Sequence, residues 1–251
     1  MNNIVKSFEK SQRKKLIAFI TGGDPSVEMT KKIIIALAEA GVDIIEIGVP
    51  FSDPSAEGPV IERANIRGLA SKTTVNHLFD MVKDVRTNID IPILFATYGN
   101  LIFAYGKEKF MKNCAKVGID GVVVPDVPHE EMGEFKDAAN AYGIIQISTI
   151  APTSTSRIES IVKGAQGFLY CTLPDAEKGG AILDAVANRL PCIIEADFET
   201  PTEKQRQILN QAAGILIKES LVSCIETHGD GAIDELINHV KTVRAWLDLD
   251  I

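Results

Sequence analysis

Short apolar runs alternate with longer amphipathic stretches from one end of the chain to the other. The apolar runs are rich in isoleucine or valine and lack a polar face, which is typical of strands covered on both sides. They predict strands at residues 16–21, 43–49, 91–97, 121–125, 144–150, 168–172, 192–196 and 215–217. The stretches between them predict helices at residues 25–40, 76–85, 107–117, 130–141, 156–162, 181–189, 203–213 and 232–246.

A closed barrel is the fold that this alternation favours. Strand–helix repeats with no strand hairpin between them predict an α/β protein with a parallel sheet, and eight repeats match the closure of a (β/α)8 TIM barrel. An open, doubly wound sheet is the alternative, but no GxGxxG opens the first repeat. Residues 1–251 are therefore interpreted as a single barrel domain.

The first 15 residues are polar and charged, unlike a signal peptide. Ile4, Val5 and Phe8 share one face at helical spacing. We expect a short amphipathic helix ahead of the first strand.

Composition narrows the range of functions. The formal net charge is −8 at pH 7, which argues against nucleic acid or an anionic membrane as a main partner. No apolar run is long enough to span a membrane. The cysteines are widely spaced and the histidines scattered, so we expect reduced thiols, a cytoplasmic location and no metal site. The cysteines are Cys114, Cys171, Cys192 and Cys224.

Glu46 is the first candidate for chemistry. It lies inside the apolar run at residues 43–49, where an ionised carboxylate is costly unless it is paired or protonated. Burial is expected to raise its pKa toward neutrality, which suits proton transfer. Glu57 follows on the next loop and could face Glu46 across a ligand. The alternative is that Glu46 hydrogen-bonds within the barrel and Glu57 is solvated.

The other strand ends add polar groups to the same predicted mouth of the barrel. Tyr170 could donate a hydrogen bond there, or could be a core aromatic. The seventh predicted strand, at residues 192–196, brings Glu195 and Asp197 at its end, and the turn after residues 215–217 reads Lys218-Glu219-Ser220. The mouth is therefore expected to be strongly acidic.

The loop after the second predicted strand has a separate interpretation. Pro50, Phe51, Asp53 and Pro54 form a rigid exposed loop that contains an aromatic, and such a loop could dock a partner. The alternative is a plain structural connection.

Several motifs together resemble the tryptophan synthase alpha subunit family. The run EIGVPFSDP at residues 46–54, followed by EGPVI at residues 57–61, is similar to that family's signature. NIR at residues 65–67, YGN at residues 98–100 and VPDVP at residues 124–128 resemble further family motifs in the same order. The likeness is specific over about residues 1–172 and then weakens, although the repeat pattern continues.

The resemblance implies a cofactor-free retro-aldol cleavage of indole-3-glycerol phosphate to indole and glyceraldehyde 3-phosphate. It also implies a beta subunit, to which indole passes. Glu46 would shuttle a proton with Glu57 as the second carboxylate, and Tyr170 would border the indole site. The remaining expected substrate contacts are Phe19, Tyr98, Asn100, Gly179, Lys218 and Ser220. The loop containing Pro50, Phe51, Asp53 and Pro54 would face the partner.

This chain departs from the family pattern at three places. Glu57 replaces an aspartate, and a carboxyl misplaced by roughly an ångström can cost about a hundredfold in rate. The lid after the sixth strand, residues 174–180, is shorter and lacks the family's glycine-threonine pattern. The family binds the substrate phosphate on glycine-rich turns, whereas the matching turns here carry Glu195, Asp197 and Glu219. Like charges a few ångströms apart repel by about 1 to 4 kcal/mol.

Three functions remain compatible with the sequence. The first is the family's lyase reaction with an unusual phosphate site. The second is a divergent lyase acting on a neutral or cationic substrate. The third is a non-catalytic barrel that only docks to a beta-type subunit.

Overall fold

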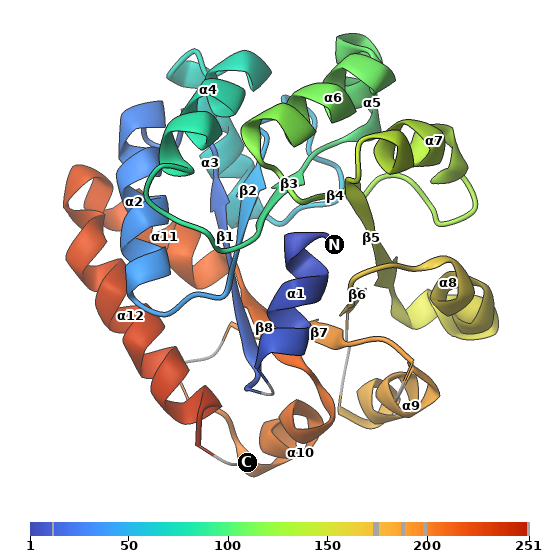
Figure 1. The fold of residues 1–251 in the computed structure, drawn as a ribbon. Coiled ribbons are helices and arrows are strands. Elements are labelled where there is room, and N and C mark those ends of the chain that lie inside the picture. Colours follow the sequence, from blue (N-terminus) through green and yellow to red (C-terminus); the bar gives the residue numbers. More distant parts are fainter. Residues whose placement is uncertain (12, 173–175, 187–188, 198–199, 250–251) are drawn as a thin grey trace.

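Parallel strands close into a barrel in chain order in the computed structural model, which describes residues 1–11, 13–172, 176–186, 189–197 and 200–249 (Figure 1). The strands are β1 (Lys15–Thr21), β2 (Ile44–Gly48), β3 (Ile93–Ala96), β4 (Gly121–Val123), β5 (Ile145–Ile150), β6 (Leu169–Cys171), β7 (Cys192–Glu195) and β8 (Gly214–Ile217). The pairing of β8 with β1 closes the ring. The predicted (β/α)8 barrel is confirmed.

Helices surround the barrel (Figure 1). They are α1 (Asn3–Lys10), α2 (Val27–Glu39), α3 (Pro59–Ala70), α4 (Val75–Val85), α5 (Gly99–Tyr105), α6 (Lys107–Val117), α7 (Gly133–Ala141), α8 (Ile158–Gly164), α9 (Ala176–Val186), α10 (Glu203–Gln211), α11 (Glu219–His228) and α12 (Ala232–Leu247). Short 3-10 turns, η1 (Pro152–Arg157) and η2 (Gly229–Gly231), precede α8 and α12.

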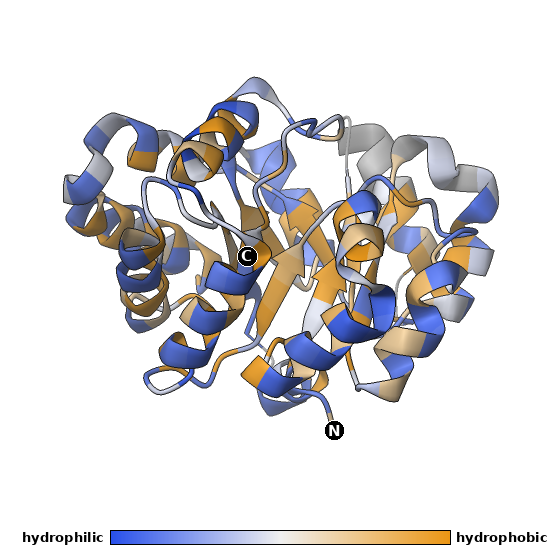
Figure 2. Cartoon of the chain, turned by 90° about the horizontal axis from the view of Figure 1, so that it is seen from above, coloured by the Kyte–Doolittle hydropathy of each residue, from blue (hydrophilic) through white to orange (hydrophobic). Residues whose placement is uncertain are grey.

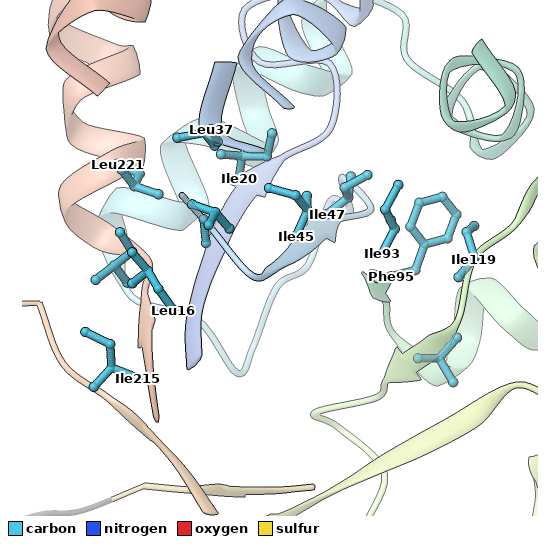
Figure 3. Packing of buried hydrophobic residues seen from close by; sticks show 14 of the residues in the cluster. Leu16, Ile20, Leu37, Ile45, Ile47, Ile93, Phe95, Ile119, Ile215 and Leu221 are labelled. Carbon is cyan, nitrogen blue, oxygen red and sulfur yellow. The ribbon is translucent and has the colours of Figure 1, made fainter. Parts of the chain in front are cut away.

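Each strand directs alternate side chains into the barrel and toward the helices, because the side-chain period of a strand is two. Ile45 and Ile47 belong to the apolar layer between strands and helices, part of which Figure 3 shows. Ile44 and Phe19 belong to the separate cluster inside the barrel. Glu46 pairs in register with Phe19 of β1, so its carboxyl enters the interior. The strands are apolar, while the helices carry polar outer faces (Figure 2).

Helix α1 covers one end of the barrel, as the amphipathic pattern predicted (Figure 1). Ile4 is fully buried, and the Phe8 ring lies 5.7 Å from that of Phe168. The Asn2 side chain donates hydrogen bonds to the carbonyls of Asp120 (2.8 Å) and Gly143 (2.9 Å). These contacts hold the helix beneath β4 and β5 and leave the opposite end of the barrel open to the loops that follow the strands.

The sequence missed α3, α5 and α11. Helix α3 starts with Gly58 as its N-cap and Pro59 in the first turn, and its apolar face is short. Helix α11 begins directly at the end of β8 without a side-chain cap from its own N-cap residue, so it has no local start signal. Helix α9 begins at Ala176, inside the stretch predicted as a lid, rather than at residue 181. The predicted lid and helix also include residues 174–175 and 187–188, which lie outside the described residues.

Two cysteines differ from the prediction of reduced thiols. Cys171 on β6 and Cys192 on β7 are paired as a disulfide with their Cα atoms 6.4 Å apart, while Cys114 and Cys224 are free. The strands are neighbours in the barrel, a proximity that sequence spacing did not reveal. Over the described residues, no helix combines the length and apolarity that crossing a membrane requires.

Candidate active site

Glu46 and Tyr170 form a buried pair inside the barrel. Glu46 is 4 % exposed and Tyr170 is 7 % exposed. The Tyr170 hydroxyl donates a hydrogen bond to Glu46 Oε2 across the barrel, from β6 to β2. Tyr170 is held by an edge-to-face contact with Phe168, with ring centroids 5.0 Å apart. Both side chains are therefore buried in the core, and they also form a polar contact with each other. The structure combines the two interpretations that the sequence left open for Glu46 and Tyr170.

Burial raises the pKa of Glu46 from 4.5 to about 7. The hydrogen bond from Tyr170 and the positive charge of Lys218 act in the opposite direction, and the charges of Glu57 and Glu195 raise the pKa further. Burial also raises the pKa of Tyr170 well above its ordinary value, with the neighbouring Glu46 adding to the effect. Tyr170 therefore keeps its proton near neutral pH, whereas Glu46 can take up or release one.

Glu57 and Lys218 form a second pair at the mouth. Lys218 follows β8, and its ammonium contacts Glu57 Oε2 on the loop between β2 and α3. The two side chains are 16 % and 10 % exposed. The ammonium also lies 5.0 Å from the centre of the Phe19 ring, in a cation–π contact. Phe19 in turn packs on Gly48, where an added Cβ would lie 2.6 Å from the ring.

Lys218 stays charged in this setting. Burial lowers the pKa of Lys218, but the carboxylates of Glu57, Glu195 and Glu46 raise it, and the net shift is upward. Glu195 is exposed at the end of β7, but partial desolvation raises the pKa of its carboxyl, and the charge of Lys218 partly offsets this rise. The Lys218 ammonium thus counters several carboxylates that reach the mouth from β2, β7 and the Glu57 loop.

Asp197 caps helix α11. Its Oδ2 accepts the backbone N–H groups of Lys218 (3.0 Å) and Glu219 (2.7 Å), and its Oδ1 accepts that of Ser220 (3.2 Å) together with the Ser220 hydroxyl. These are the N–H groups that a helix start leaves without intrahelical partners. Asp197 is therefore a hydrogen-bonded cap, rather than a free charge as its position in the sequence suggested.

The loop after β2 folds over the end of β3. The Phe51 ring stacks on Tyr98 at 5.0 Å, and the Tyr98 hydroxyl accepts the Ala56 N–H at 3.1 Å. The Phe51 N–H donates to Asn65 Oδ1 at 2.9 Å. Pro50, one of the expected docking residues, is buried, whereas Asp53 is exposed and Phe51 and Pro54 are half-buried. Only the outer part of this loop is available to a partner.

A small cavity lies beside Glu57. Its volume is about 10 Å³, and Phe19, Tyr98 and Thr97 are among its lining residues. That volume is about enough for one water molecule, so a larger ligand in this cavity requires Glu57 or another of its lining residues to move. A cavity of about 670 Å³ lies at the opposite end of the barrel, between α1 and the ends of α9, α10 and α12. That cavity is remote from Glu46.

Asp24 supports the first strand end by an ion-pair network. Its buried carboxylate accepts two hydrogen bonds from Arg67 of α3, at 2.7 and 2.8 Å. Arg67 also contacts Glu226 of α11 at 2.8 Å, and Glu226 pairs with Arg63. The network ties the turn after β1 to α3 and α11, which carry the Glu57 loop and the Lys218 turn. The Asp24–Arg67 pair therefore has a structural role, since it holds the elements that carry the site.

Two expected substrate contacts are not seen in the site. Asn100 is exposed in the first turn of α5. Gly179 lies within α9, but its surroundings fall outside the described part of the chain, so its expected contact stays a prediction. Sequence reasoning missed Asn65, which positions Phe51, and Thr97, whose buried hydroxyl has no hydrogen-bond partner among the described residues. Asn65 belongs to the NIR motif, but the motif does not reveal which backbone group its side chain binds, and Thr97 is one polar residue at the end of an ordinary predicted strand.

The site's chemistry depends on carboxylates, a phenol and an ammonium. Across the residues that the structure describes, no group of three or more His, Cys, Asp or Glu side chains is arranged to hold a metal ion. The arrangement can move a proton at Glu46. The charged pair of Glu57 and Lys218 lies at the mouth of the barrel.

Comparison with known proteins finds one family. A family profile described as Tryptophan synthase alpha chain matches residues 5–246, well beyond residue 172, where the motifs in the sequence weakened. A Tryptophan synthase alpha chain from a Thermoanaerobacter species is 45% identical over 240 residues, which cover 90% of this chain and 91% of that protein.

Solved structures agree. The tryptophan synthase subunit alpha of Legionella pneumophila superposes with a TM-score of 0.92 at 30% identity, covering 99% of both chains. A chain of the tryptophan synthase complex from Pyrococcus furiosus gives a TM-score of 0.85 at 28% identity, covering 93% of this chain and 99% of that one.

Proposed function

This chain belongs to the tryptophan synthase alpha chain family, and from that premise we propose that it cleaves indole-3-glycerol phosphate to indole and glyceraldehyde 3-phosphate. The observation that carries the proposal is the buried Glu46–Tyr170 pair, because it supplies a carboxyl group whose pKa lies near 7. A retro-aldol cleavage needs a group that can both give and take a proton near neutral pH.

Glu46 is proposed to move the protons of the reaction. In its protonated form it donates to C3 of the indole ring, and as a carboxylate it accepts the proton of the glycerol hydroxyl next to that carbon. The C3–C1′ bond then breaks, its electrons return to the ring, and the hydroxyl carbon becomes the aldehyde. One proton enters and one leaves, so the carboxyl group ends in the state in which it began.

Glu57 is proposed as the second carboxylate. Protonation at C3 places positive charge on the indole nitrogen, and a carboxylate beside it stabilises that charge in a site shielded from water. The Phe19 and Tyr98 rings, which line the cavity beside Glu57, supply the apolar walls that an indole needs. Tyr170 orients Glu46 and keeps its own proton.

The direct test is release of indole from indole-3-glycerol phosphate by the purified protein, with and without a tryptophan synthase beta subunit. Measurable turnover that is lost in Glu46→Gln supports the proposal. Absence of turnover under both conditions would exclude it.

A beta subunit is the proposed partner, since one of the similar structures is of a tryptophan synthase complex. The exposed Asp53 and the half-buried Phe51 and Pro54 are the proposed contact. Because Phe51 stacks on Tyr98, a partner that shifts this loop would also alter the site. Asp53→Arg should weaken co-elution with a beta subunit in size-exclusion chromatography, while Asp137→Arg, on the exposed face of α7, should not. Equal co-elution of both variants would contradict this contact.

A cytoplasmic location is proposed with this function. Reduced cysteines are no longer an argument for it, because Cys171 and Cys192 are paired. Fractionation of cells would test it directly.

A further inference from the structure

The Lys218–Glu57 ion pair holds a proposed reacting group in a closed arrangement. Its two side chains follow β8 and β2, the two strands that flank β1. Both side chains are largely buried. The ammonium is also fixed over the Phe19 ring. While this pair is formed, one oxygen of Glu57 is engaged and the cavity beside it measures only about 10 Å³.

The nearby backbone donors already have an acceptor. Asp197 takes the N–H groups of Lys218, Glu219 and Ser220, and the Ser220 hydroxyl as well. An anionic ligand group arriving here therefore finds those donors occupied by a carboxylate, and among the described residues of the mouth the Lys218 ammonium is a cation that it can bind.

Charges of one sign surround the ammonium. Glu46 of β2, Glu195 of β7 and Glu57 of the loop all attract it, while Asp197 and Glu219 lie beside its backbone. A phosphate dianion carries more charge than any one of these carboxylates and accepts several charge-assisted hydrogen bonds. It can therefore compete with Glu57 for the ammonium, although the surrounding carboxylates weaken its hold.

We infer that Lys218 is a substrate-sensing residue: it keeps Glu57 paired until the phosphate of the substrate draws the ammonium away and frees the Glu57 carboxylate for the indole end. This inference rests on the proposed function. Lys218 then acts as a positioning and specificity residue, since a ligand without a phosphate cannot open the pair. Release of Glu57 from the pair also lets this side chain move away from the small cavity that it lines.

The test compares two substrates, indole-3-glycerol phosphate and its phosphate-free counterpart indole-3-glycerol. Lys218→Met should lower kcat/KM for the phosphorylated substrate by about 10- to 100-fold, the loss expected for one charged hydrogen-bonded contact. Its kcat/KM for indole-3-glycerol should stay level or rise, because Glu57 is no longer engaged. Lys218→Arg should restore most of the preference for phosphate, and Lys32→Met, an exposed lysine on α2, is the matched control.

Equal losses on both substrates in Lys218→Met would overturn the inference, since that result indicates a purely structural lysine. An unchanged preference for the phosphorylated substrate would overturn it as well.

A second measurement separates this inference from the proposed function. Glycerol 3-phosphate is titrated into the protein, and the carboxyl ¹³C signal of Glu57 is followed by NMR. The inference predicts a change in that signal in the wild-type protein and none in Lys218→Met. If the signal responds while indole-3-glycerol phosphate is not cleaved, the sensing role stands and the proposed reaction fails. If indole-3-glycerol phosphate is cleaved but the Glu57 signal does not respond, the proposed reaction stands and the sensing role of Lys218 fails.

Discussion

Two carboxylates of this barrel, one inside β2 and one after β7, lie in environments that make them different groups. Glu46, inside β2, is 4 % exposed and has one hydroxyl as a hydrogen-bond donor. Asp197, after β7, is exposed and accepts three backbone N–H groups and a hydroxyl at the start of α11. Burial with a single donor favours the protonated form of Glu46, whereas Asp197 uses both of its oxygens to bind the start of α11. Position in the barrel therefore makes one carboxyl a proton carrier and the other a helix cap.

Lys218 connects the two regions. Its backbone N–H binds Asp197, its ammonium binds Glu57, and its charge lowers the pKa of Glu46. A change at the cap can thus reach the proton carrier through one residue. The predictions below separate the contributions of the two regions.

Removal of the proton carrier should have the largest effect. Glu46→Gln keeps the shape of the side chain and its ability to accept the Tyr170 hydrogen bond, but it cannot transfer a proton. We expect kcat to fall by about 10²- to 10⁴-fold, the usual contribution of general acid–base catalysis. Steady-state indole release measures it, with Glu28→Gln on the exposed face of α2 as the control. Unchanged turnover would refute the role of Glu46.

The same substitution should remove a pH dependence of stability. The folded pKa of Glu46 is raised from 4.5 to about 7, so between these values the unfolded chain is ionised while the folded protein keeps its proton. The free energy of unfolding should then fall as pH rises through this window, by roughly 3 kcal/mol in total. Urea denaturation at pH 5 and pH 8 measures it. Glu46→Gln should lack this decrease, and an identical decrease in both proteins would contradict the raised pKa.

Tyr170→Phe should shift the proton carrier without removing it. The Tyr170 hydrogen bond lowers the pKa of Glu46, so its loss should raise that pKa above about 7, by about one pH unit for a bond to a charged group. The pH–rate profile of kcat/KM should move upward by that amount. Tyr142→Phe, at the end of α7, is the control. A profile that stays in place would show that another group sets it.

Loss of the cap should have the smallest effect. Asp197→Ala leaves the first N–H groups of α11 without their acceptor, which costs about 1 kcal/mol in typical helices. For a domain of this size we expect a fall in Tm of about 2–4 °C, measured by calorimetry against Asp137→Ala. The pH-dependent stability assigned to Glu46 should persist. A Tm equal to that of the control would indicate that Asp197 does not stabilise α11.

Much of the fold could be predicted because the signals are local. The strands read as apolar runs since each is covered on both faces, and the boundaries agree within a few residues. Helices α3 and α11 were missed because their start signals are weak or come from elsewhere in the chain; the cap of α11 is Asp197, 22 residues before Glu219. The Cys171–Cys192 pair was missed for a related reason, since it depends on which strands are neighbours.

In the candidate site, too, the sequence revealed single residues but not their partners. Glu46 could be found because a carboxylate in an apolar strand is costly and needs a partner. The partner itself, Tyr170, is 124 residues away, and Lys218 and Glu57 are 161 residues apart. The turns after β7 and β8 were interpreted as a row of repelling charges, because a sequence does not reveal which backbone N–H groups face a carboxylate.

The sequence by itself determined the repeating strands and helices, the closed ring and the presence of one buried carboxylate, since each depends on side-chain period and on the cost of burying charge. Only the tertiary structure decided which groups meet across the ring. That choice depends on loop paths and side-chain directions, which bring residues more than a hundred positions apart into contact and so decide whether a carboxyl holds a proton, an ammonium or the start of a helix.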